Sequence, residues 1–74
     1  MEPTAAAKDL YNELVRFGWL VSVGIGGKDS TGFPILVVYA TDLSKARQQT
    51  PPEWHGFSVR LKRMGRVRPA TRVG

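Results

Sequence analysis

The sequence predicts an α+β domain, a two-layer sandwich with the element order α-β-β-α-β and a three-stranded mixed sheet. The spacing of the apolar residues changes from three or four to two at Gly18, which indicates a helix followed by a strand. An apolar run at residues 33–40 is typical of a buried central strand, and alternation resumes at Phe57. The sixteen residues between these two segments leave room for a helical crossover. We therefore expect a β-hairpin followed by a βαβ unit.

The first helix is expected between Thr4, a hydroxyl N-cap, and Gly18, a glycine C-cap. Its apolar residues recur at spacings of three and four, which places them on one face: Ala7, Leu10, Tyr11, Leu14 and Phe17. The charged residues of the opposite face are expected to be solvated.

The hairpin begins at Trp19, where alternation predicts a half-buried strand as far as Ile25. Glycine, aspartate and serine in residues 26–32 predict its turn. The letters GIGGKDST also suggest a phosphate loop. The Walker pattern, however, requires a glycine in place of Ser22, a hydroxyl residue in place of Asp29, and a following helix, so a hairpin turn is favoured. A dinucleotide-binding fingerprint fails because the third glycine is missing.

The second strand is apolar on both faces. Its side chains divide into two sets: Ile35, Val37 and Tyr39 on one face, and Leu36, Val38 and Ala40 on the other. A short helix is expected over residues 41–49, with Thr41 or Asp42 as its N-cap, before two prolines end it.

The third strand is expected to bury one face and to expose a basic one. Phe57, Val59 and Leu61 alternate with Ser58, Arg60 and Lys62. Met64 and Gly65 indicate a bend, after which residues 66–68 extend the strand. We expect one domain over residues 1–74, with residues 69–74 frayed.

Composition excludes several classes of function. The chain has 74 residues and no cysteine, so disulfides, thiolate zinc sites and cysteine nucleophiles are excluded. No signal peptide or membrane span is apparent, which favours a cytoplasmic protein without membrane contact. The single histidine, His55, lacks a nucleophile and a metal-ligand pattern around it, and the six carboxylates are scattered. We therefore predict a non-enzymatic protein with no catalytic residue, no metal and no cofactor.

The C-terminal charge is one-sided. Residues 57–74 carry six positive side chains and no negative ones, whereas residues 1–56 carry five positive and six negative. Such a field attracts nucleic acid or another polyanion. The alternative is a solvated strand face that guards against edge-to-edge aggregation. The predicted phosphate contacts are Arg60, Lys62, Arg63, Arg66 and Arg68, and base stacking is not expected, because Phe57 is the only aromatic residue of the stretch.

A second candidate surface follows from the number of layers. Two helices on one side of a three-stranded sheet would leave Leu20, Leu36 and Val38 uncovered on the other side. An uncovered apolar patch of this kind indicates an interface for a protein partner or a homo-oligomer. One helix on each face would instead bury both sides.

Three segments, LVSVGIGG, GFPILVVYAT and PPEWHGFSVRLKRMGRVRPAT, share a pattern with known domains. The pattern is a glycine-rich first strand, an apolar second strand, a proline before a glycine-led third strand, and a closing G-x-x-R-A-like element. In this the chain resembles small bacterial domains of unassigned function, some of them similar to accessory segments ahead of trypsin-like peptidase modules. The resemblance spans residues 19–70. It implies an accessory or interaction domain, and it places no catalytic residue on this chain.

Overall fold

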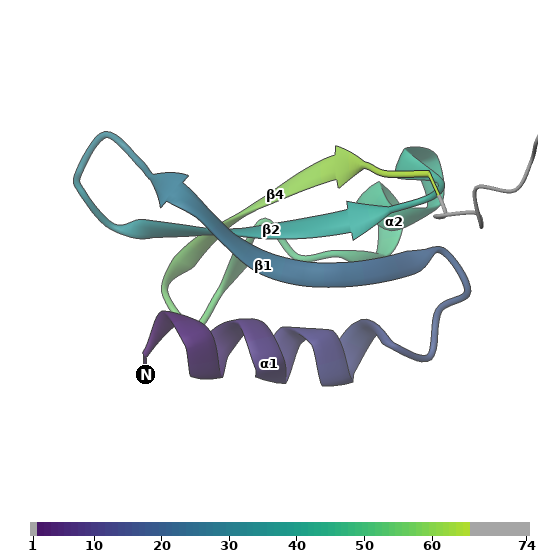
Figure 1. The fold of residues 1–74 in the computed structure, drawn as a ribbon, viewed down its shortest axis with the longest axis horizontal. Helices are drawn as coiled ribbons and strands as arrows, with labels where there is room; N and C mark the ends of the chain where they lie inside the picture. The colour runs from purple at the N-terminus through teal and green to yellow at the C-terminus, as the bar shows by residue number, and fades with distance from the viewer. Residues whose placement is uncertain (1, 66–74) are drawn as a thin grey trace, which may run out of the picture.

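The computed structural model describes residues 2–65, which form two helices and a mixed four-stranded sheet (Figure 1). The elements are α1 (Pro3–Leu14), β1 (Leu20–Lys28), β2 (Pro34–Ala40), α2 (Leu43–Gln49), β3 (Glu53–Trp54) and β4 (Phe57–Arg63). The predicted α+β class and mixed sheet are confirmed. The predicted number of three strands is wrong, because β3 adds a fourth. The expected extension at residues 66–68 and the expected fraying of residues 69–74 lie outside the described residues.

Helix α1 begins and ends earlier than the sequence indicated: its C-cap is Val15, so the predicted Gly18 cap is wrong. Glu2 is its N-cap and makes no side-chain capping bond, so the predicted Thr4 cap is wrong. Pro3 occupies the first turn, where the missing N–H removes a donor that would have no partner in the helix. The buried residues of the helix are Ala6, Ala7, Leu10 and Leu14, whereas Tyr11 is 38% exposed.

The strand order is β1-β2-β4-β3. Strands β1 and β2 are antiparallel, and β2 and β4 are parallel, so the predicted hairpin and βαβ crossover are both present. Helix α2 is short as expected, and Asp42 caps it by accepting a 3.2 Å hydrogen bond from the Lys45 amide.

The fourth strand, β3, pairs with β4 through a two-residue turn, His55–Gly56. Both residues have positive φ, 50° for His55 and 85° for Gly56, which suits the twist of a tight β-hairpin. The prediction missed β3 because it is only two residues long and because a histidine takes the place where asparagine or aspartate usually signals such a turn.

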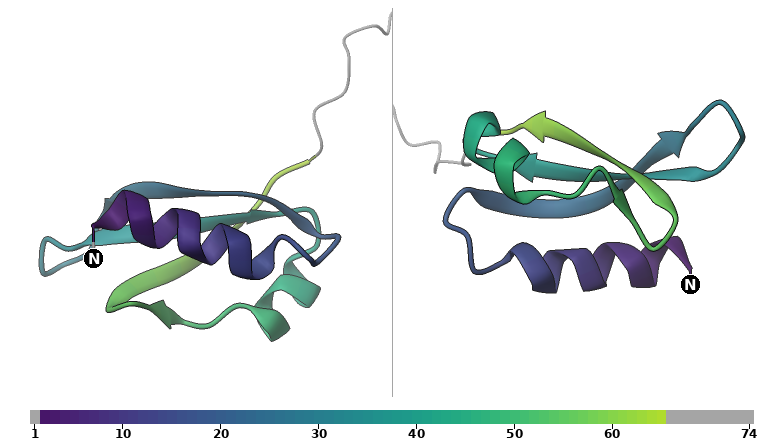
Figure 2. Two further views of the ribbon diagram at one scale, coloured as in Figure 1. Left: turned by 90° about the horizontal axis from the view of Figure 1, so that it is seen from below. Right: turned by 180° about the vertical axis from the view of Figure 1, so that it is seen from behind.

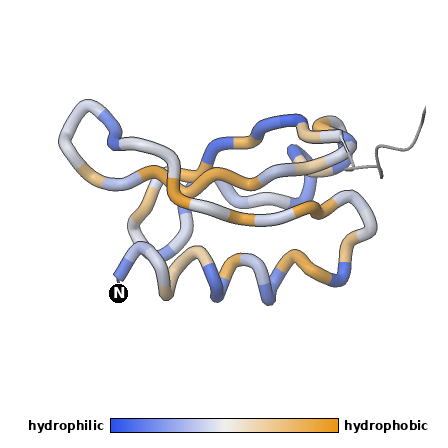
Figure 3. The backbone as a smooth tube through the Cα atoms, viewed as in Figure 1, coloured by the Kyte–Doolittle hydropathy of each residue, from blue (hydrophilic) through white to orange (hydrophobic). Residues whose placement is uncertain are grey.

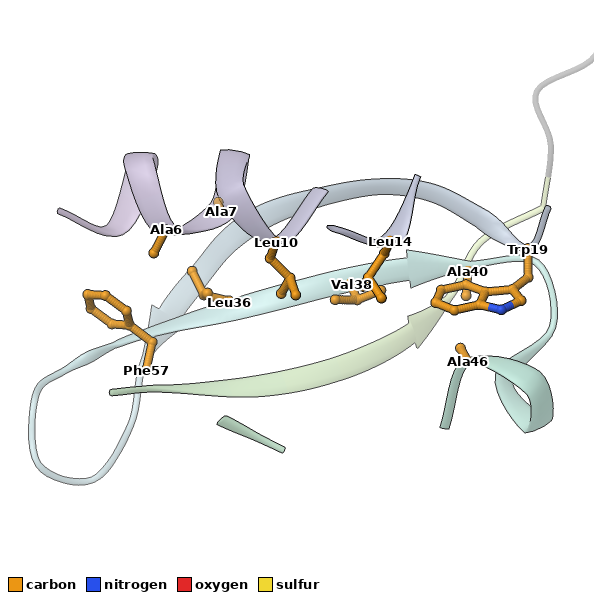
Figure 4. Packing of buried hydrophobic residues seen from close by; sticks show 10 residues of the cluster. All are labelled: Ala6, Ala7, Leu10, Leu14, Trp19, Leu36, Val38, Ala40, Ala46 and Phe57. Atoms are coloured by element: carbon orange, nitrogen blue, oxygen red, sulfur yellow. The ribbon is translucent and has the colours of Figure 1, made fainter. Parts of the chain in front are cut away.

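Both helices pack on the same face of the sheet (Figure 2). Figure 4 shows the single hydrophobic cluster that they enclose with the sheet. Its buried residues are Ala6, Ala7, Leu10, Leu14, Trp19, Leu36, Val38, Ala40, Ala46 and Phe57. The prediction that Phe57, Val59 and Leu61 face the core is confirmed.

The interface predicted at Leu20, Leu36 and Val38 is on the covered face, so that prediction is wrong. Leu36 and Val38 are 0% exposed, and Leu20 packs against the core. The reason lies in the strand register, which places Val59 beside Leu36 and Leu61 beside Val38. This is the face with apolar neighbours on both strands, and the helices cover it.

Strand β1 departs from simple alternation. Leu20 pairs with Ala40 and Ser22 pairs with Tyr39, so Val21 is an extra residue in the ladder. Leu20 rather than Val21 therefore packs against the core. The tip of the hairpin extends beyond the N-terminal end of α1 (Figure 1). Ile25, farther along β1, is 47% exposed.

Candidate functional site

The face of the sheet opposite the helices, which we call the open face, is the candidate site. The strand register assigns it Ser22 and Gly24 of β1, Ile35, Val37 and Tyr39 of β2, Glu53 of β3, and Ser58, Arg60 and Lys62 of β4. Gly26 also belongs to it, because a Cβ there would point at Val37. Neither helix covers this face.

Two predicted anion contacts lie on the open face. Arg60 and Lys62 are exposed, and in the register they are the partners of Val37 and Tyr39. Figure 3 shows hydrophilic positions along β4 next to hydrophobic positions along β2. The ion pairs of residues 2–65 join Arg16 to Glu13 and His55 to Asp9, so neither cation is neutralised by a described carboxylate.

Of the other three predicted contacts the structure describes only Arg63, and Arg63 does not join them on this face. Arg63 pairs with Ala40 and shares the strand side of Val59 and Leu61, so it is exposed at the end of β4 on the helix side of the sheet. Arg66 and Arg68 lie outside the described residues. Of the five predicted basic residues, the structure therefore brings two together on the open face.

Tyr39 is a site residue that the sequence reasoning missed. It is half-buried on the open face, between Ser22 of β1 and Lys62 of β4. A Cβ added to Gly24 would lie 3.7 Å from Cε2 of Tyr39, so the ring extends across β1 where the glycine leaves room. Base stacking was not expected because only aromatics within residues 57–74 were considered. The parallel pairing of β2 with β4 supplies the ring from another strand.

Gly26 is the second glycine of β1 on the open face. A Cβ at this position would lie 2.5 Å from Cγ2 of Val37, closer than real Cβ atoms approach. Only a residue without a side chain fits, because Val37 occupies that space. Because Gly24 and Gly26 carry no side chains, Val37 and Tyr39 form the surface of the open face beside β1.

The β1–β2 turn is held by Asp29 and does not lead into a helix. The Asp29 carboxylate accepts hydrogen bonds from the Thr31 amide (2.8 Å), the Thr31 hydroxyl (2.6 Å) and the Phe33 amide (3.0 Å). The Thr31 hydroxyl bond and then the Phe33 amide bond lower the pKa of Asp29 below its ordinary value of 3.8. The hairpin interpretation of GIGGKDST is therefore confirmed, with the loop's carboxylate occupied in its own turn.

His55 has a carboxylate partner that is distant in sequence. Its Nε2 lies 2.8 Å from Oδ2 of Asp9 on α1, and its ring packs edge-on against Trp54 at 5.0 Å. Trp54 itself packs against the core, as expected for a turn anchored by its tryptophan. No hydroxyl group in residues 2–65 hydrogen-bonds to His55. The pair therefore links the β3–β4 turn to α1, without a neighbouring nucleophile.

A cleft of about 440 Å³ lies elsewhere, between the start of β1 and α2. Its walls include the stacked rings of Phe17 and Trp19, 5.3 Å apart, and the polar residues Thr41, Asp42, Lys45, Gln48 and Gln49. His55 does not line it, and Asp42 is engaged as the α2 cap. The Thr41 hydroxyl is also engaged, since it donates a 3.4 Å hydrogen bond to the Trp19 carbonyl.

Residues 2–65 contain no group of three or more histidine, cysteine, aspartate or glutamate side chains that could hold a metal ion. Neither helix of this part of the chain has the length and apolar character needed to cross a membrane.

Comparisons with protein-family models, with curated proteins and with solved structures gave no match. The geometry and the charge of the open face are therefore the evidence for function.

Proposed function

We propose that this chain is a non-enzymatic binding domain whose open face contacts an anionic partner such as nucleic acid. One observation carries the proposal: Arg60 and Lys62, two exposed cations that form no ion pair within residues 2–65, lie beside Tyr39 on a face that neither helix covers. The proposal includes the cytoplasmic location expected from the sequence, where nucleic acids are available as partners.

The electrostatics of the open face support a phosphate ligand. Arg60 offers a planar fork of N–H donors, and Lys62 offers a flexible point charge. Glu53 is the only carboxylate that the register places on this face among residues 2–65, and its partner Ser58 is at the opposite end of β4 from Lys62. Ser58 is two residues from Arg60 and four from Lys62, so the surroundings of Lys62 on this face contain no nearby described carboxylate that would repel phosphates.

The test is fluorescence anisotropy with labelled oligonucleotides and a labelled heparin fragment over a range of salt concentrations. The double variant Arg60→Gln, Lys62→Gln is compared with Lys8→Gln, Arg47→Gln, which removes the same charge from exposed positions on the two helices. Each lost phosphate contact lowers the slope of log K against log salt by about 0.7–0.9, so the β4 variant loses about 1.5 in slope. The helix variant keeps the wild-type slope.

Two results would remove the proposal. One is the absence of binding to every polyanion at low salt. The other is an equal loss of affinity in the β4 and helix variants, because net charge and not the open face would then account for binding.

A second candidate function is association with a protein partner or with another copy of the chain. The observation in its favour is the half-buried Val37 on the open face, together with Phe33, which is 57% exposed near the hairpin tip; Ile35 is only 8% exposed and adds little to this surface. A symmetric contact through this face would bring Arg60 and Lys62 of two copies together, and like charges disfavour it. Sedimentation velocity separates the two candidates, because a monomer over the accessible concentration range excludes self-association.

A further inference from the structure

We infer that the anion bound on the open face is a single-stranded nucleic acid, with an unpaired base stacked on Tyr39 and its phosphates held by Arg60 and Lys62. This inference rests on the proposed function and narrows it to one class of partner. Three features carry it: the access to the Tyr39 ring, the placement of the two cations beside it, and the width of the face.

The Tyr39 ring is accessible because of what β1 lacks. Gly24 has no side chain, and the ring extends over it, with 3.7 Å between Cε2 and the position of the absent Cβ. Gly26 in turn leaves its space to Val37. On the β1 side, no side chain from positions 24 or 26 rises above the tyrosine. An aromatic ring without side chains from the next strand above it can stack with an unpaired base of any kind, since every base has a π-face.

The two cations lie on one side of this ring, along β4. Lys62 is the register partner of Tyr39 on the next strand, about 5 Å away, and Arg60 lies about 7 Å farther along β4, two residues back. A base stacked on Tyr39 therefore has its own backbone within reach of the flexible Lys62 stem and the Arg60 fork. Ser22, the partner of Tyr39 on β1, adds a hydroxyl group on the opposite side of the ring.

The width of the face argues against a duplex. The axes of β1, β2 and β4 span about 10 Å before any side chain is added. The major groove is about 12 Å wide and admits a helix or a two-stranded ribbon, so a face three strands wide does not enter it. Paired bases are also stacked on their neighbours, and only an unpaired base offers its π-face to Tyr39.

A polyanion without bases would contact the two cations of the open face but would not stack on Tyr39. Heparin-like chains pair with Arg60 and Lys62 but have no aromatic base to stack on Tyr39. The juxtaposition of this ring with two cations that no described carboxylate pairs therefore matches a nucleic acid strand better than a sulfated polysaccharide.

The experiment measures anisotropy with a labelled oligothymidylate, with the same strand annealed to its complement, and with a heparin fragment. The variants are Tyr39→Leu, Tyr39→Phe and, as a matched control, Tyr11→Leu on α1, where the tyrosine is 38% exposed. Stacking of one base makes a difference of about five- to hundredfold, so Tyr39→Leu weakens single-strand binding by this factor. Tyr39→Phe and Tyr11→Leu bind as the wild type does, and heparin binding does not change in Tyr39→Leu.

The wild-type protein alone also tests the inference, independently of how the variants fold. Equal affinity for the single strand and the duplex at one salt concentration would overturn it, as would unchanged single-strand binding in a folded Tyr39→Leu variant. In either case, salt-dependent heparin binding that requires Arg60 and Lys62 would leave the proposed function standing. If none of the three probes binds, both the inference and the proposed function are refuted.

Discussion

Replacement of Gly26 by alanine is expected to destabilise the fold, because the Val37 side chain of the neighbouring strand occupies the space that the new Cβ would need. The added Cβ would lie 2.5 Å from Cγ2 of Val37 and 3.8 Å from its Cβ. Valine is stiff at χ1, and β2 is paired on both sides, so the strain passes to the backbone. Overpacking of this kind costs about 1–3 kcal/mol, a large part of the few kcal/mol expected for a domain of this size.

Urea unfolding measures this cost through the fluorescence of Trp19 and Trp54, both of which contribute to or pack against the core. The midpoint of Gly26→Ala is expected to fall while the m value stays unchanged. Gly24→Ala is the matched control, because its Cβ would make an ordinary 3.7 Å contact with Tyr39. Alanine also loses less backbone entropy than glycine in a strand, so this control is expected to keep or slightly raise the wild-type stability.

A double-mutant cycle identifies the cause. Val37→Ala removes Cγ2, so the combined variant Gly26→Ala, Val37→Ala is expected to lose less free energy of unfolding than the sum of the two single variants. A Gly26→Ala protein with the wild-type midpoint, or strict additivity in the cycle, would contradict the packing described for the open face.

Three further predictions concern the rest of the fold. Leu36→Ala is expected to lower the free energy of unfolding by about 2–5 kcal/mol, as for a buried leucine. A stable Leu36→Ala variant with weaker self-association would instead restore the interface that the sequence suggested. His55→Val is expected to be less stable than His55→Asn by about 1–2 kcal/mol, because both lose the Asp9 bond but only the β-branched residue is strained at φ 50°. Equal urea midpoints would contradict this. The pKa of Asp29 is lowered in the folded state, so its contribution to stability is complete above the unfolded pKa and is lost as the pH falls through the folded value. An NMR titration of its carboxyl group should give a midpoint below 3.8, and the substitution Asp29→Asn should remove this part of the acid dependence.

Local patterns were enough to predict much of the fold. The helical spacing before Gly18, the Asp42 cap and the alternation of Phe57, Val59 and Leu61 each express a preference of neighbouring residues. Which face of β2 the helices cover could not be predicted in this way, because both faces of the strand are apolar. It depends on the register with β4, which pairs Leu36 with Val59 and is a property of two strands that are distant in sequence.

The same limit applies to the candidate site. The basic side of β4 was predicted correctly at Arg60 and Lys62, since alternation alone separates them from the buried residues of the strand. Tyr39 was not recognised, because only the parallel register brings it beside Lys62. Two signals in the sequence pointed to it: its place in the alternation of β2, and the glycines of β1, whose missing side chains leave room for a large neighbour.

NMR shift mapping of the amides with a single-stranded oligothymidylate tests the role of the open face most directly. The largest shifts are expected at Val37, Tyr39, Arg60 and Lys62, with little change in α1 or in the cleft beside Trp19. Shifts confined to the helices or to that cleft, or no shifts at low salt, would show that the open face does not bind the anion.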